Sequence, residues 1–236
     1  MSTLALSDAV DARLPLGAGG LFYGVYPARV VDIADPDAQG RVKVTLPWAA
    51  SGDGAPYEVW ARLATMMAGN DRGTWFIPDV DDEVLVAFGG GDTSRPFVVG
   101  ALWNGADAPP ASVDGGENIV KRIRSRNGVQ ITLDDTDGQE SIVIETPGGQ
   151  TATLSDGPGT IELRDSNGNT VTMEGAGVTV TTSAKLTVNA STVEVNASMV
   201  TVNSGMSKFS GVVQADTVIT NSVISASYTP GAGNIW

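Results

Sequence analysis

The chain of 236 residues contains no histidine and no cysteine. These absences exclude a Ser-His-Asp triad, a Cys-His pair, a histidine or cysteine metal site and any disulfide, because each needs one of those side chains. No stretch approaches 18 consecutive apolar residues, and residues 1–24 lack the basic start and apolar run of a signal peptide. We therefore expect a chain that is made in the cytoplasm without a signal peptide.

Positive charge is also scarce. The chain has 14 Lys and Arg against 27 Asp and Glu, which gives a formal net charge of −13. Affinity for nucleic acid comes largely from Lys and Arg contacts with phosphates. The balance therefore predicts that nucleic acid is not a partner.

Aromatic residues are confined to one part of the chain. Eleven of the 14 lie between Phe22 and Trp103, and none lies between Asn104 and Lys208. The aromatic-rich part holds five short runs rich in Val and aromatics, bounded by Gly, Pro and Asp turns, which predicts a small closed β-barrel. The runs are ARVVDI, GRVKVTLP, YEVWARLA, DEVLVAF and PFVVGAL.

The later part of the chain repeats a short unit. Asn189, Asn196 and Asn203 recur every seven residues, in KLTVNAS, TVEVNAS and MVTVNSG. The apolar residues of each unit lie two apart, which is the strand period and not the spacing of a coiled coil. Less regular short strands separated by Gly and Asp turns precede the repeat, from VQITL (129–133) to VTV (178–180).

A seven-residue unit of this kind cannot bury its own apolar side chains. Burying one Val or Leu contributes roughly 1.5–3 kcal/mol, whereas ordering one backbone residue costs roughly 1–2 kcal/mol. Seven residues are also too few for one chain to complete a coil, so we predict that three chains wind into a triangular prism. The predicted trimer core consists of Val178, Val180, Leu186, Val188, Val193, Val195, Val200 and Val202.

Residues 25–104 resemble the oligosaccharide/oligonucleotide-binding (OB) barrel of VgrG proteins and phage baseplate assembly protein V, the central spikes of contractile injection systems. One departure is Asp81, where the family usually has glycine before the DEV run. The matching residues are Asp35, Pro36, Gly40, Arg41, Trp60, Arg62, Pro78, Asp82, Glu83 and Gly100.

The resemblance implies an all-β fold, an N-terminal OB-fold barrel followed by an intertwined trimeric triple-stranded β-helix, or β-prism. It implies a non-enzymatic homotrimeric spike without cofactors, which caps the inner tube of a phage tail or injection particle and pierces the target envelope, with transient contact with the target membrane. A separate hub protein is expected, because only 24 residues precede the barrel, and a PAAR-type tip protein, because the HxH iron tip of many short spikes needs histidine. The expected parts are an N-terminal segment (1–24), the barrel (25–104), a linker and collar (105–126), the prism (127–210) and a C-terminal tip (211–236).

Two groups of residues have two interpretations each. The basic residues Lys121, Arg122, Arg124 and Arg126 either offset neighbouring carboxylates or form a collar that grips a partner or sister chain. Tyr228 and Trp236 either dock the tip protein or plug the end of the prism.

Two other functions are weighed. A trimeric polysaccharide-degrading tailspike would use paired carboxylates, which abound at Asp134, Asp135, Asp137 and Glu140, but residues 104–208 have no aromatic to hold a sugar ring. An OB-fold nucleic-acid-binding protein is disfavoured by the net charge of −6 over residues 25–110.

Overall fold

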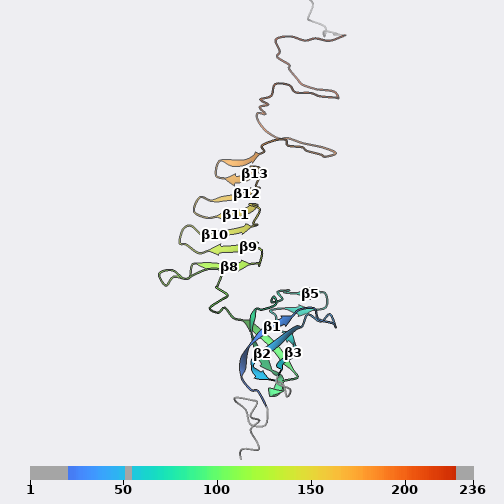
Figure 1. The fold of residues 1–236 in the computed structure, drawn as a ribbon. Helices are drawn as coiled ribbons and strands as arrows, with labels where there is room; N and C mark the ends of the chain where they lie inside the picture. Colours follow the sequence, from blue (N-terminus) through green and yellow to red (C-terminus); the bar gives the residue numbers. More distant parts are fainter. Residues whose placement is uncertain (1–20, 51–54, 227–236) are drawn as a thin grey trace, which may run out of the picture. The chain divides into compact units, whose positions relative to one another are not determined.

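The computed structural model describes residues 21–50 and 55–226, and Figure 1 shows their fold. Fourteen strands and one short 3-10 turn make up its regular structure over these residues. The described residues include no helix that could span a membrane. The predicted all-β class is confirmed.

Five strands close into the predicted barrel, in the order β1-β2-β3-β7-β6. β3 and β7 pair in parallel and the other neighbours pair antiparallel. A 3-10 turn, η2 (Gly89–Gly91), separates β6 from β7. The strands are β1 (Val25–Asp32), β2 (Val42–Ala50), β3 (Pro56–Leu63), β6 (Glu83–Phe88) and β7 (Pro96–Ala101), and a small hairpin of β4 (Ala68–Gly69) and β5 (Arg72–Gly73) projects between β3 and β6.

The barrel has a core of its own. Alternating strand residues point inward, and Val30, Val42, Val44, Val84 and Val86 are completely buried. The rings of Phe22, Tyr26, Trp48 and Phe88 pack at one end, with centroids 5.0–5.9 Å apart. Aromatic residues bury a large apolar area each, so the core of this small barrel is formed within one chain.

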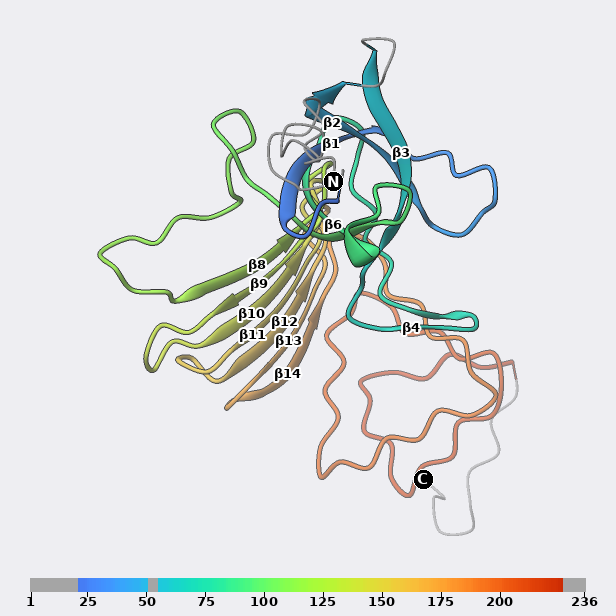
Figure 2. The same cartoon turned by 90° about the horizontal axis from the view of Figure 1, so that it is seen from below.

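The second part is a seven-stranded antiparallel meander in which each strand pairs with the next along the chain. Figure 2 shows the sheet as a single twisted layer, with β8 at one edge and β14 at the other. The strands are β8 (Val120–Arg124), β9 (Gln130–Asp134), β10 (Ser141–Glu145), β11 (Thr151–Ser155), β12 (Thr160–Arg164), β13 (Thr170–Glu174) and β14 (Gly177–Thr181).

Two features of this part differ from the sequence-based expectation. The expected linker and collar, residues 105–126, contains the first strand of the sheet, β8. Its three basic residues, Lys121, Arg122 and Arg124, pair in register with β9, so they belong to a ladder.

The repeat segment is the second difference. Residues 182–226 contain no strand in the single chain, although the heptapeptides were expected to be strands. The physical reason is the one that predicted a trimer, because a lone copy of this segment has no neighbouring strand with which to form a ladder.

Candidate functional site

One face of the meander is apolar from β9 to β14, and β8 adds Ile123 and Lys121 to its edge. The ladder registers align its residues in two cross-strand rows, and residues that oppose each other in a ladder lie on the same face. One row is Leu133, Ile142, Leu154, Ile161, Met173 and Val178, and the other is Ile123, Ile131, Ile144, Ala152, Leu163, Val171 and Val180.

This apolar face is uncovered in the single chain. Its Ile and Leu side chains are 37–53% exposed, although hydrophobic residues of this size are usually buried. The opposite face is lined mainly by Thr, Ser, Glu and Arg, such as Thr132, Thr153 and Glu162. A contiguous exposed apolar surface of this kind marks an interaction site.

The predicted trimer core falls partly on this face. Val178 and Val180 lie in β14, on the apolar rows, and are 67% and 53% exposed. The other predicted core residues lie in the repeat segment and are 64–69% exposed in the single chain, so their role stays a prediction. They are Leu186, Val188, Val193, Val195, Val200 and Val202.

Most residues of the apolar face were missed by the sequence reasoning. It followed the exact heptapeptide repeat and did not assign Ile131, Leu133, Ile142, Ile144 or Leu163 to the trimer core. The signal was present, because apolar and polar residues alternate in β9 and β12, and β10 departs from this pattern only at Val143.

Three of the four basic residues of the expected collar have acceptors within the chain. Lys121 Nζ donates to the Asn118 carbonyl at 2.7 Å and also contacts the Asp135 carboxylate. Arg122 donates to Thr132 Oγ1 and the Pro110 carbonyl, and Arg126 to Asp79 Oδ1 at 2.8 Å. These contacts agree with the first interpretation, and a contact with a partner stays a prediction. Arg124 is the fourth member and lies in β8.

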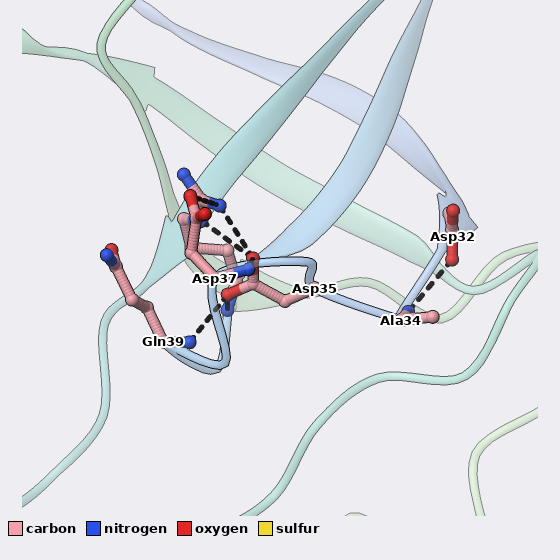
Figure 3. Close-up of polar contacts among 6 residues, drawn as sticks. Asp32, Ala34, Asp35, Asp37 and Gln39 are labelled. Carbon is pink, nitrogen blue, oxygen red and sulfur yellow. Dashed lines mark hydrogen bonds and ion pairs between the residues drawn. The ribbon is translucent and has the colours of Figure 1, made fainter.

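On the barrel, the loop between β1 and β2 is organised around one carboxylate (Figure 3). The Asp35 side chain is 5% exposed and accepts hydrogen bonds from the backbone N–H groups of Asp37, Gln39 and Arg41. The Arg41 side chain donates two further hydrogen bonds to Asp35 Oδ1, from Nε at 3.1 Å and from Nη2 at 2.6 Å. The Arg41 guanidinium, followed by these backbone donors, holds the pKa of the Asp35 carboxyl well below its usual range.

The same arginine joins the loop to the barrel wall. The Arg41 guanidinium carbon lies 5.7 Å from the centroid of the Trp60 ring, and Lys43 Nζ lies 5.4 Å from it. Gly40, with φ +71°, and Pro36 complete the loop between β1 and β2. Four predicted residues, Asp35, Gly40, Arg41 and Trp60, are thus brought together, as a structural cluster that fixes the loop.

The remaining matched residues of the barrel are spread around it. Arg62 lies 5.6 Å above the Phe97 ring on the neighbouring strand, and Gly100 pairs with Leu85 beside a register shift. Asp82 Oδ2 accepts a hydrogen bond from the backbone N–H of Asp79. Asp79 directly follows Pro78, which is half-buried. Glu83 begins β6 and accepts from the Asn104 amide at 2.9 Å.

Asp81 takes the backbone conformation that glycine favours. Its φ is +78°, and its N–H donates to the Val30 carbonyl at 2.9 Å. The turn before β6 therefore has a left-handed residue even though aspartate replaces the usual glycine. Aspartate tolerates this conformation better than most residues do.

The acidic turn after β9 has no arrangement of paired catalytic carboxylates. Asp134 accepts from the hydroxyl and backbone N–H of Thr136, which lower its pKa, whereas a general acid needs a raised one. Asp135 contacts Lys121. Over the described residues, no cluster of three or more acidic side chains could hold a metal ion.

Tyr228 and Trp236, the predicted docking residues, lie outside the described residues.

Two known domain families match this chain, one in the barrel and one in the later part. Residues 26–103 match the injector OB domain of type VI secretion systems and phage baseplates. Residues 141–206 match the C-terminal trimerisation domain of phage baseplate protein V, which includes β10 to β14 and the heptapeptides.

Curated relatives are type VI secretion spikes. VgrG2a of Pseudomonas aeruginosa is 31% identical over 122 residues, which is 49% of this chain and 14% of that protein. VgrG3 of Vibrio cholerae is 33% identical over 113 residues, 46% of this chain and 11% of that protein. The chain spans only a small part of the length of these relatives.

Proposed function

Because the chain belongs, by its OB domain and its trimerisation domain, to the baseplate-V and VgrG-like spike family, we propose that it works as a homotrimeric central spike. In this proposal three copies bring their apolar faces together around a three-fold axis. The observation that carries it is the continuous apolar surface of the meander, which nothing in the described chain covers. A closed prism of three such sheets shelters those side chains and leaves the polar faces outside.

The proposed role is mechanical and not enzymatic. Strand ladders across a prism resist bending, because bending breaks many backbone hydrogen bonds at once. The outer face of Thr, Ser and charged residues suits passage through an envelope. The trimer would be incorporated into a phage virion or injection particle, cap its inner tube and pierce the target envelope, with a hub protein at the barrel end and a PAAR-type protein at the tip.

Neither alternative function gains support from the barrel or the acidic turn. Arg41 and Lys43 flank Trp60, as in a nucleic-acid site, but both cations face carboxylates, Arg41 at Asp35 and Lys43 Nζ 3.9 Å from Glu58. The carboxylates after β9 organise turns or meet lysine, as described above. A polysaccharide-degrading or nucleic-acid-binding role therefore has no assembled site among the described residues.

The first test is the mass of the purified protein by light scattering. We expect three times the chain mass of 24.3 kDa. A stable monomer at micromolar concentration would overturn the proposal.

The second test places charge in the repeat segment. Replacing Val188, Val195 and Val202 together by Asp should abolish trimers, because buried unpaired carboxylates are strongly unfavourable. The matched control places carboxylates at the outward-facing position between the two apolar residues of each unit. It replaces Thr187 and Thr201 by Asp, and the middle unit already has Glu194 at this position. The control should remain trimeric, and equal behaviour of the two variants would contradict the predicted core.

A further inference from the structure

Three asparagines of the chain are followed directly by glycine, namely Asn104, Asn127 and Asn167. In such a pair the glycine has no side chain to block the approach of its backbone nitrogen to the asparagine carboxamide. That approach is the first step of deamidation, and it needs a carboxamide that is free to turn toward the nitrogen. The lability of each pair in the folded protein therefore depends on what holds its carboxamide.

The Asn104 carboxamide is held on both sides. Its Nδ2 donates to Glu83 Oε2 at 2.9 Å and to Asp107 Oδ2 at 3.0 Å. Its Oδ1 accepts hydrogen bonds from the backbone N–H groups of Ala106 and Asp107, both at 2.8 Å. Rotation toward the Gly105 nitrogen would have to break these hydrogen bonds, so the folded protein protects this pair.

Asn127 and Asn167 occupy the same position in two hairpin turns, at residues 125–129 and 165–169. The N–H of the first residue donates to the carbonyl of the fifth, at 2.8 Å in the earlier turn and 3.1 Å in the later one. The N–H of the fourth residue donates to the carbonyl of the first, at 2.9 Å and 3.5 Å. That fourth residue is a glycine, with φ of +88° and +85°. The two asparagines therefore form a matched pair.

The first residue of the turn differs, and it determines what holds the carboxamide. Asp165 accepts hydrogen bonds from the backbone N–H of Asn167 at 2.9 Å and from its Nδ2 at 3.3 Å. Ser125 takes this place in the earlier turn, and its Oγ accepts from the backbone N–H of Val129 at 3.1 Å. Asn127 is exposed, and its carboxamide has no hydrogen-bond partner in the part of the chain that the structure describes.

The charges beside the two glycines also differ. A methyl group placed on Gly128 would lie 3.9 Å from Arg124 Nη2. The attacking nitrogen must lose its proton, so a nearby guanidinium favours the reaction there, whereas the Asp165 carboxylate disfavours it at Gly168. The Gly128 N–H makes the shorter backbone hydrogen bond, which opposes attack. A hydrogen bond between neutral groups is, however, about half as strong as one to a carboxylate.

We propose that Asn127 is a modification site, at which the folded protein deamidates ahead of its other two Asn–Gly pairs. The Gly128 nitrogen attacks Cγ of Asn127, and the side-chain nitrogen leaves as ammonia with the Gly128 N–H proton, which forms a cyclic imide. Water then opens the imide at either carbonyl carbon and gives aspartate or isoaspartate. The new carboxylate lies next to Arg126, whose Nη1 donates to Asp79 Oδ1 at 2.8 Å, so it competes with the barrel for that arginine. The site requires neither the trimer nor the spike function proposed above.

The test follows all three pairs in one incubation of the natural protein at mildly alkaline pH. Peptide mass spectrometry measures deamidation at each pair from the gain in mass when OH replaces NH2. We expect Asn127 to react roughly fivefold faster than Asn167, which is the ratio that one net hydrogen bond contributes. Asn104 should react most slowly. In urea, which removes the folded structure, the three rates should become similar.

A pair of reciprocal variants tests the cause. Ser125→Asp supplies the carboxylate that the later turn has, and it should slow the reaction at Asn127 toward the rate at Asn167. Asp165→Ser removes that carboxylate and should accelerate the reaction at Asn167, while circular dichroism checks that each variant is folded.

Three results would overturn the proposal. They are equal rates at Asn127 and Asn167 in the folded natural protein, the same ranking of rates in urea, and an unchanged rate at Asn127 in a folded Ser125→Asp protein. If a variant does not fold, the comparison of the folded natural protein with the protein in urea decides.

Discussion

Leu163 offers the sharpest test of the apolar face. It lies on the second row of the meander, opposite Ala152 and Val171, and is 49% exposed in the single chain. Full burial of a leucine side chain contributes about 1.5–3 kcal/mol, so covering the exposed half contributes roughly 1 kcal/mol per copy. Leu163→Ala therefore removes roughly 3 kcal/mol from a trimer. That change corresponds to an increase of roughly a hundredfold in the trimer dissociation constant.

Leu163→Asp should have a far larger effect, because three carboxylates would have to leave water and approach one another. We expect this variant to be monomeric in sedimentation velocity over a micromolar concentration series. The matched control is Thr170→Asp, on the opposite face and across the ladder from Arg164. The control should stay trimeric. A trimeric Leu163→Asp protein would refute the assignment of this face to the trimer core.

Three further predictions concern the turns. The pKa of Asp165 is lowered from 3.8 to about 2, chiefly by the Asn169 amide, so its contribution to stability is complete above about pH 3.8 and is lost as the pH falls through about 2. The difference in thermal midpoint between the natural protein and Asp165→Asn should therefore shrink over that range. The Asp81→Gly variant should have a thermal midpoint equal to or above that of the natural protein. In Asp81→Ala the free energy of unfolding, measured in urea, should fall by roughly 1 kcal/mol, because alanine is strained at positive φ. Arg41→Lys should lower the barrel's thermal midpoint, because lysine cannot reproduce the forked contact with Asp35, while Lys43→Arg should leave it unchanged.

The barrel could be predicted almost completely from the sequence. Its five strands are Val-rich and aromatic-rich runs with clear turn residues between them, and each of the predicted runs contains or overlaps one strand of the barrel. What could not be predicted is the small β4–β5 hairpin, because Ala68–Gly69 and Arg72–Gly73 have neither length nor alternation.

The meander was predicted less completely, for two physical reasons. β8 was assigned to a linker because three of its five residues are basic. With only two apolar residues, the strand does not show the alternation of apolar and polar residues that identifies a strand in a sequence. The apolar face emerges only when the registers bring residues such as Ile131, Ile144 and Leu163 into one row. Each strand contributes only one or two of those side chains, so no single run in the sequence looks like a core.

The barrel and the meander bury their apolar residues in different ways, and this difference determines how the molecule can assemble. The barrel closes on itself around buried valines and the Phe22 cluster, so it needs no partner to fold. The meander is a single layer with one apolar face, which other copies cover in the proposed trimer. A variant that loses trimers through Leu163→Asp should therefore keep the barrel's aromatic near-ultraviolet circular dichroism. Independent barrels joined to sheets that are completed only on association would allow each chain to fold its barrel first and commit to the shaft only when three copies meet.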